Sequence, residues 1–342
     1  MIVTPEAACR DTFELDEAKR PMRGVLHGAL TTACVTLATL LLCEAALRLA
    51  DFRILREGVG ERSLTYGYDA ELGWAPIPNT RATVTTERTI HAQHNSLGFR
   101  DIEFTRDGRP VIMFIGDSFV WGVDAEADER FTDLLRVRLP NYTIVNAGVS
   151  GFGTDQELLL TRRIWDKIRP DILVLMFCSA NDRRDNSTNV RYDDYQKPYF
   201  TVRDNALVVH NQPVPKSRQL YIKQDWIVRH SYVARVLVSA YVEIAHPRVS
   251  VPDPTEKLVD ALRDFAQARG AGFLVGLQFP DQPLVEHLAA QAIPFASFEG
   301  ADAYGPESGG HWTPTGHRLV TERLLALFAE QGIRPAGTGQ SD

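Results

Sequence analysis

Ser118 is the first residue of this chain that has the setting of a nucleophile. It follows the apolar run 111–115 and the turn residues Gly116 and Asp117. An apolar run without alternation is typical of a strand buried on both faces of a parallel sheet. Open α/β sheets hold their ligands beyond the carboxyl ends of such strands. Ser118 is therefore well placed for covalent chemistry, although Gly, Asp and Ser also form ordinary turns.

Three further segments carry residues that such chemistry needs. Residues 142–156 read as an apolar strand and a glycine-rich turn containing Gly151, and residues 171–182 as a third buried strand that ends near Asn181. Close to the C-terminus, His311 offers a base whose pKa normally lies near neutrality. Ester hydrolysis requires a nucleophile, a base that takes its proton and donors for the developing oxyanion. Each residue also has an ordinary use, because glycine shapes turns and asparagine caps chain segments.

The order of Ser118, Gly151, Asn181 and His311 resembles the four sequence blocks of the SGNH (GDSL-type) hydrolases, over residues 95–328. The resemblance implies that Ser118 is the nucleophile and His311 the general base. It implies oxyanion donors in the backbone N–H groups of Ser118 and Gly151 and in the side-chain amide of Asn181. It implies no metal and no organic cofactor.

One residue of the family pattern is missing. Members usually carry an aspartate two or three residues before the catalytic histidine, and here these positions are Gly309 and Ser308. Asp302 and Glu307 lie upstream, and either can orient the imidazole if the loop folds back. A backbone carbonyl or Ser308 can also hold the ring and leave a dyad, and the third alternative is a weakened or inactive enzyme. We expect a working pair of serine and histidine with a substitute partner.

Apolar runs and amphipathic segments alternate through the rest of the chain. We expect strands near 111–116, 142–146, 171–177, 272–278 and 293–297. We expect helices near 128–138, 154–168, 255–269, 282–291 and 314–331. The alternation predicts an α/β fold with a doubly wound parallel sheet and right-handed crossovers. It agrees with the three-layer α/β/α, flavodoxin-like fold with five strands that the resemblance implies.

The chain divides into five expected regions: a polar tail at 1–23, an anchor helix at 24–47, a small β appendage at 52–100, the hydrolase-like domain at 101–333 and a C-terminal tail at 334–342. Large apolar side chains in the appendage favour packing against the domain over a flexible linker. The sequence at 95–100, Asn-Ser-Leu-Gly-Phe-Arg, also resembles membrane-anchored members of the family.

The alternation of strands and helices stops between residues 183 and 254, a stretch far longer than a normal connection. We expect a hairpin that turns at Asp204-Asn205 and a helical segment near 218–245. Because the insertion begins directly after Asn181, we interpret it as a cap over the active-site mouth. A structural insertion away from the pocket is the alternative.

Residues 24–43 contain no Asp, Glu, Lys or Arg. Twenty helical residues span about 30 Å, the thickness of the hydrocarbon core of a bilayer. We expect a single uncleaved membrane anchor, since the segment is longer than the core of a signal peptide and follows an acidic tail. Positive charges are balanced on its two sides and give no orientation. The resemblance implies a single pass through a bacterial inner membrane, with a periplasmic or extracellular catalytic domain.

The composition excludes other classes of protein. A net charge of −7 over 342 residues gives no reason to expect a nucleic-acid partner. The four cysteines have neither disulfide nor metal-ligand spacing, and no nucleotide-binding fingerprint is present.

The leading interpretation is an esterase that removes small acyl groups from an envelope glycan or lipid through an acyl-serine intermediate. An O-acyltransferase of an envelope polysaccharide forms the same intermediate and passes the acyl group to a sugar hydroxyl. The alternative from another class is a non-catalytic glycan-binding or assembly protein with a degenerate triad.

Overall fold

A five-stranded parallel sheet forms the centre of the molecule. The structure is a computed structural model that describes residues 6–58, 60–192, 194–306 and 309–335, with 6–24 described by their backbone. The strands lie in the order β13-β12-β7-β5-β6. Their bounds are β5 Val111–Gly116, β6 Thr143–Asn146, β7 Ile172–Phe177, β12 Gly272–Leu277 and β13 Phe295–Ser297. The expected doubly wound sheet is therefore confirmed.

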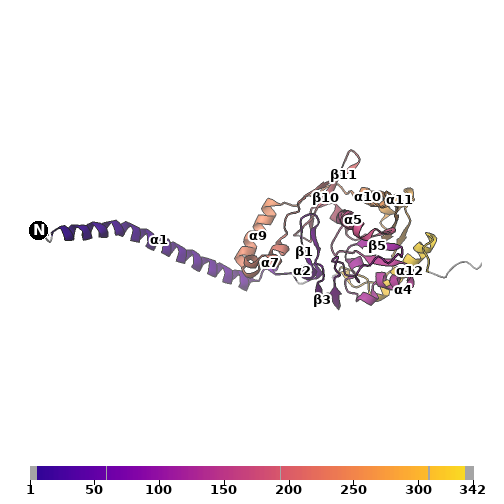
Figure 1. Ribbon diagram of the computed structural model, residues 1–342, viewed down its shortest axis with the longest axis horizontal. Coiled ribbons are helices and arrows are strands. Elements are labelled where there is room, and N and C mark those ends of the chain that lie inside the picture. The colour runs from indigo at the N-terminus through magenta and orange to yellow at the C-terminus, as the bar shows by residue number, and fades with distance from the viewer. Residues whose placement is uncertain (1–5, 59, 193, 307–308, 336–342) are drawn as a thin grey trace, which may run out of the picture.

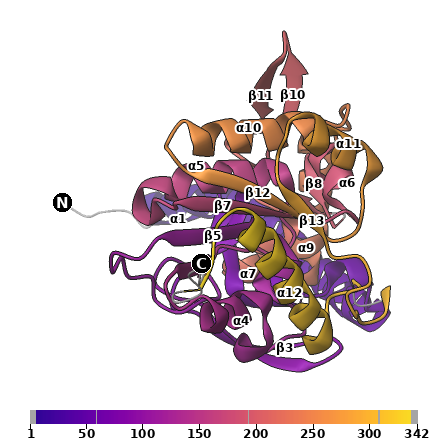
Figure 2. The ribbon, with the colours of Figure 1, turned by 90° about the vertical axis from the view of Figure 1, so that its right-hand side faces the viewer.

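Helices cover both faces of this sheet, as Figure 2 shows. One face carries α5 (Thr154–Ile168), α10 (Thr255–Gln267) and α11 (Gln282–Ala290). The other carries α4 (Phe131–Arg138) and α12 (Pro314–Glu330). These layers make the three-layer α/β/α architecture that the sequence predicts.

Strand β5 shows why its sequence lacks alternation. All six of its residues are buried. Met113 and Ile115 belong to the apolar cluster on the α5 side, whereas Ile112 and Phe114 belong to the cluster on the α12 side. Both faces of the strand exclude water, so both need apolar side chains.

The N-terminal appendage packs into the same core as the sheet. It consists of helix α2 and two antiparallel hairpins: α2 Glu61–Thr65, β1 Tyr66–Asp69, β2 Gly73–Pro76, β3 Arg81–Thr85 and β4 Thr89–Gln93. Tyr66, Trp74 and Phe99 are buried in the apolar cluster that also holds α5. The appendage is thus a packed part of the body and not a flexible linker.

The insertion begins with α6 (Asp182–Asn186) and two hairpins: β8 Val190–Arg191 with β9 Tyr195–Gln196, and β10 Tyr199–Arg203 with β11 Ala206–His210. The second hairpin turns at Asp204 and Asn205, as expected. Both residues have positive φ, 49° and 63°, which the type I′ turn of a tight hairpin requires.

The helical segment expected near 218–245 is three helices rather than one: α7 Arg218–Gln224, α8 Trp226–His230 and α9 Tyr232–Ala245. The expected helical segment is divided because Asp225 and Ser231 both adopt extended backbone conformations. Ser231 also accepts a hydrogen bond from the backbone N–H of Ala234, so it caps α9 and starts a new helix.

Helix α1 (Glu6–Ala50) projects from the body (Figure 1), and residues 6–23 of the expected polar tail form its first turns. Its segment Val25–Ala50 has 26 residues and contains an 18-residue window with a mean hydropathy of 1.8, none of which is buried. By length and composition this helix can cross a membrane. Its C-terminal end lies beside α9.

Candidate active site

Ser118 opens the short helix α3 (Ser118–Trp121) immediately after β5. The carboxylate of Asp117 accepts a hydrogen bond from the backbone N–H of Phe119 at 3.0 Å and caps this helix. The N–H of Ser118 has no partner within the helix, because the first N–H groups of any helix point outward. Ser118 is only 6% exposed. Strand β5 and the Asp117 cap together place the Ser118 hydroxyl at the carboxyl end of the sheet.

His311 meets this hydroxyl from a loop that precedes α12. Its Nε2 lies 2.9 Å from Oγ of Ser118, although the residues are 193 positions apart. The ring packs on Phe119, with 5.2 Å between centroids. Burial lowers the pKa of His311. The imidazole is therefore neutral at pH 7, and its Nε2 can accept the serine proton when Nδ1 carries the hydrogen.

Asp124 is the carboxylate that faces the other nitrogen of His311. Its Oδ2 lies 3.8 Å from Nδ1, which is an ion-pair distance and not a hydrogen bond. Both atoms are buried, and neither has a hydrogen-bond partner among the described residues. Two unpaired polar atoms that face each other in a buried site need only a small movement to bond.

The N-terminal appendage holds Asp124 in this position. The Thr86 hydroxyl and the backbone N–H of Arg88 both donate to Oδ1 of Asp124, the latter at 3.0 Å. Thr86 and Arg88 lie in the turn between β3 and β4. The Oδ2 atom is thereby left to face the histidine.

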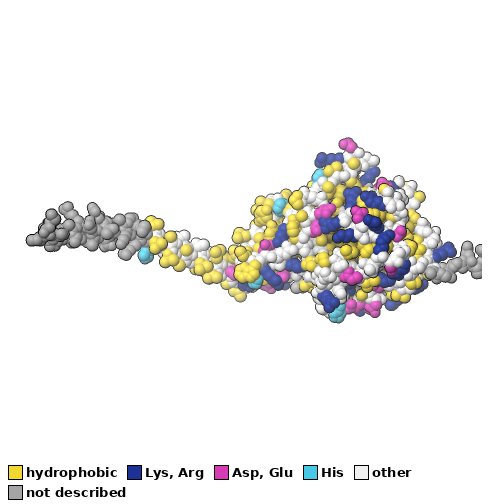
Figure 3. All heavy atoms as spheres, viewed as in Figure 1, with side chains coloured by type: hydrophobic (Ala, Val, Ile, Leu, Met, Phe, Trp, Pro, Cys, Tyr) yellow, Lys and Arg dark blue, Asp and Glu magenta, His cyan; other side chains and the backbone are white. Residues whose placement is uncertain are grey.

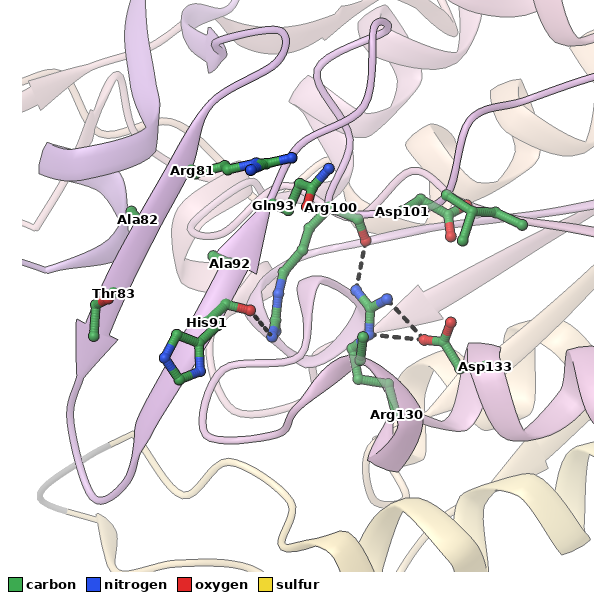
Figure 4. Close-up of a pocket in the computed structure, with 12 residues that line it drawn as sticks. Arg81, Ala82, Thr83, His91, Ala92, Gln93, Arg100, Asp101, Arg130 and Asp133 are labelled. Carbon is green, nitrogen blue, oxygen red and sulfur yellow. Dashed lines mark hydrogen bonds and ion pairs between the residues drawn. The ribbon is translucent and has the colours of Figure 1, made fainter.

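Two buried arginines tie the same loop to the appendage. Arg100 donates to the carbonyl of Gly122 at 2.5 Å and to that of Ala125 at 2.8 Å, on either side of Asp124. Figure 4 shows Arg100 and Arg130 beside the β3–β4 hairpin, in the wall of a cavity of about 580 Å³. Arg130 donates to the carbonyl of Arg100 and pairs with Asp133 at 2.7 Å. These hydrogen bonds fix the loop that carries Asp124 to the appendage.

A larger cavity of about 910 Å³ opens onto Ser118 and His311. Asn181 lines it, and its Nδ2 lies 3.5 Å from Oδ2 of Asp117. The Oδ1 atom of Asn181 has no partner among the described residues. The structure thus brings Ser118, His311 and Asn181 to one cavity.

Gly151 lies close to this cavity but behind Tyr192. Its φ is +82°, and a Cβ there would lie 2.8 Å from the Tyr192 ring, so the position requires glycine. The Tyr192 ring is stacked between the guanidinium groups of Arg62 and Arg191. Their Cζ atoms lie 3.7 and 3.9 Å from the ring centroid, respectively. Tyr192, Arg62 and Arg191 line the cavity, whereas Gly151 does not.

A family model for the GDSL-like lipase/acylhydrolase family matches residues 114–319, more than half of the chain. The chain belongs to this family. Membership implies hydrolysis of esters in general, and the matched range contains Ser118, Asn181 and His311.

Solved structures of lipolytic proteins and an esterase are similar to the chain. A G-D-S-L lipolytic protein from Veillonella parvula is 13% identical, with 64% of this chain and 98% of that chain covered and a TM-score of 0.36. A GDSL-like lipase from Bacteroides thetaiotaomicron is 12% identical, with 65% and 88% covered and a TM-score of 0.33. The esterase EstA from Pseudoalteromonas is 9% identical, with 65% and 97% covered and a TM-score of 0.36. A search of curated proteins gave no match.

Among the described residues, the carboxylate that faces Nδ1 of His311 is Asp124. Asp302 is not brought to the ring, since its carboxylate accepts from the Thr313 hydroxyl at 2.5 Å. Glu307 lies outside the described residues. Gly309 occupies the usual aspartate position with φ +96°, and a Cβ there would lie 2.9 Å from Cε1 of His311. A side chain at 309 is therefore strained, and Asp124 is the nearby acid that sequence reasoning missed.

A group of buried polar side chains includes Asp117, the residue before Ser118. Single ligand atoms of Asp117, Cys178 and Asp182 lie within 4.8 Å of one another, close enough to hold a metal ion. Burial, followed by repulsion from Asp117, raises the pKa of Asp182 well above its usual value. Burial also raises the pKa of the Cys178 thiol. Both shifts follow from the burial of the side chains around Asp117.

Proposed function

We propose that the chain is a serine ester hydrolase in which Ser118 is the nucleophile, His311 the general base and Asp124 the acid that orients the imidazole. The 2.9 Å contact between Nε2 of His311 and Oγ of Ser118 carries this proposal. A nucleophile within hydrogen-bond reach of a neutral base is what acyl transfer requires. A binding module has no need of such a contact, so the geometry favours an enzyme.

The reaction follows from these atoms. Oγ of Ser118 attacks the ester carbonyl carbon while its proton passes to Nε2 of His311. The C–O bond to the alcohol then breaks, and the leaving oxygen takes the proton from Nε2, which leaves an acyl-serine. Water attacks the acyl carbon, gives one proton to Nε2 and releases the carboxylic acid as Oγ recovers that proton. Asp124 stabilises the imidazolium that forms in each half.

The oxyanion is proposed to accept hydrogen bonds from the backbone N–H groups of Ser118 and Gly151 and from Nδ2 of Asn181. The helix start at Ser118 supports the first donor, since that N–H has no partner within the helix. The position of Asn181 in the cavity supports the third. The packing of Tyr192 on Gly151 leaves the second with the least direct support.

The walls of the cavity support a substrate with a small acyl group on a polar alcohol. The appendage contributes Glu61 and Arg62, and the insertion contributes Arg184, Arg191 and Arg248. Charged and hydroxyl-bearing walls suit a glycan or a lipid headgroup better than a long acyl chain. We therefore infer O-acyl groups of an envelope glycan or lipid as the substrate class, and the insertion as the cap that selects it.

We further propose that α1 anchors the chain in a bacterial inner membrane, with the catalytic domain in the periplasm. The uncovered apolar helix supports the anchor. A C-terminal fusion to alkaline phosphatase, which folds only outside the cytoplasm, should be active. An active phosphatase fusion supports this placement, and an inactive one of normal abundance contradicts it.

Hydrolysis of p-nitrophenyl acetate by the full chain in detergent tests the proposed chemistry. Ser118→Ala should lower kcat/KM by about 10⁴-fold or more, because the nucleophile is lost. Ser96→Ala is the matched control, since Ser96 is an exposed serine bonded to Glu103. Equal activity of Ser118→Ala and the parent would remove Ser118 from the mechanism.

A further inference from the structure

Helices α8 and α9 of the insertion carry large apolar side chains on their outer surface. Trp226 is 74% exposed, Leu237 65% and Ile244 81%. Ile227 and Tyr241 are also exposed, and we call these five residues the α8–α9 apolar face. Leu237, Tyr241 and Ile244 follow the i, i+4, i+7 spacing of one helical stripe, whereas Val242 is buried against the body. Monomeric soluble proteins rarely leave such a patch open.

This face is fixed to the end of the apolar part of α1. The carboxylate of Glu44 accepts hydrogen bonds from the backbone N–H groups of Tyr232 at 2.9 Å and Val233 at 3.0 Å. It therefore caps the N-terminus of α9. Arg48 donates to the carbonyl of His230 at 2.6 Å, and its guanidinium lies 4.9 Å from the centroid of the Tyr232 ring. The direction of α9 is thus coupled to that of α1.

Glu44 also marks the level at which an inserted helix would leave the hydrocarbon. Residues 24–43 carry no charge, and Glu44 is the first charged residue after them. Since Glu44 caps the start of α9, an α1 that crosses the bilayer would place the start of α9 at the membrane surface. Figure 1 shows α9 running across the end of α1 instead of continuing along it. Figure 3 shows hydrophobic side chains gathered over α9 beside that end.

We propose that the α8–α9 apolar face docks onto the bilayer that α1 crosses, with its side chains in the boundary between headgroups and acyl chains. Apolar continuity with α1 supports the bilayer as occupant: Leu49, Phe52 and Ile54 at and after the end of α1 are also exposed, and the segment 53–55 contacts α9. Tryptophan and tyrosine are the residues that favour this boundary. The inference uses the proposed anchor and does not depend on esterase activity.

Docking also bears on the proposed substrate. The chain leaves α9 and reaches Arg248 and Ser250, which line the catalytic cavity. A cap that rests on the membrane places one wall of the cavity close to the lipid surface. This favours an acylated substrate that is presented at the membrane.

Tryptophan fluorescence can test the docking because Trp226 is the one exposed tryptophan of five. The other four, Trp74, Trp121, Trp165 and Trp312, are 0, 0, 6 and 3% exposed, and α1 contains none. The full chain is reconstituted into vesicles of equal parts phosphatidylcholine and phosphatidylglycerol, with and without bromine on the acyl chains of the phosphatidylcholine. Brominated lipid should quench the parent and Trp165→Phe, and it should leave Trp226→Phe unquenched.

Other outcomes test the membrane anchor and the docking of the α8–α9 apolar face separately. A parent that floats with the vesicles but is not quenched overturns the docking and leaves the anchor intact. Crosslinking of unquenched parent into dimers through this face identifies a second copy as the occupant and also overturns it. A parent that does not float overturns the anchor and the docking together. Hydrolysis of p-nitrophenyl acetate is read separately, so an inactive enzyme would still give a valid answer.

Discussion

The two ring nitrogens of His311 face two different parts of the molecule, the central sheet and the N-terminal appendage. Nε2 faces Ser118 at the end of β5, and the two atoms are 2.9 Å apart. Nδ1 faces Asp124, which the β3–β4 turn of the appendage holds, at 3.8 Å. Nε2 is within hydrogen-bond distance of Ser118, whereas Nδ1 and Oδ2 of Asp124 are close but not hydrogen-bonded. The comparison indicates that the sheet fixes the reacting atoms and the appendage fixes their orientation.

The largest effect in this comparison is expected on the sheet side. Asn181→Ala removes a proposed oxyanion donor, and kcat/KM for p-nitrophenyl acetate should fall by about 10²–10³. The matched control is Asn211→Ala, which removes an asparagine in the insertion whose side chain bonds to the Lys197 carbonyl. A loss below threefold in Asn181→Ala would show that Asn181 is no donor.

A smaller effect is expected from the appendage. Thr86→Val removes the hydroxyl that bonds to Oδ1 of Asp124 and should lower kcat/KM by roughly three- to tenfold, the cost of one lost hydrogen bond. Thr85→Val is the control on the same hairpin, because Thr85 pairs with Thr89 and does not touch Asp124. Equal losses in both variants would mean that the hairpin acts through general stability.

The pH dependence of kcat/KM sharpens the assignment of the base. His311 must be neutral to accept a proton, and burial lowers its pKa below the ordinary value of 6.5. The acid limb should therefore lie below pH 6.5, and more than half of the plateau activity should remain at that pH. The rate should fall as pH drops through the lowered pKa. An acid limb centred above pH 6.5 would contradict a buried, neutral base.

The fold was largely predictable because its signals are local. An uninterrupted apolar run such as Val111 to Ile115 specifies a doubly buried strand, and the turn at Asp204 and Asn205 was readable for the same reason. The helical character of residues 218–245 was predicted, but its division at Asp225 and Ser231 depends on the local backbone conformation of these two residues.

The site was predictable only where a motif marks it. Ser118, Asn181 and His311 lie in blocks of local sequence that can be read, and the structure brings them to one cavity. Asp124 was missed because nothing in its sequence neighbourhood links it to a histidine 187 positions later. The signals available were its place in the loop after Ser118 and the missing acid before His311. The position of Asp124 also depends on Thr86 and the β3–β4 turn, which are distant from both Asp124 and His311 in sequence.

Labelling of the full chain with a fluorophosphonate, followed by mass spectrometry and rate measurement, tests the assignment of the triad most directly. We expect the adduct on Ser118 in the parent. Asp124→Asn should slow labelling by roughly 10- to 10³-fold, less than the loss of a directly bonded acid, whereas Asp302→Asn should label at the rate of the parent. An adduct on another residue, or slow labelling in Asp302→Asn together with unchanged labelling in Asp124→Asn, would contradict the assignment.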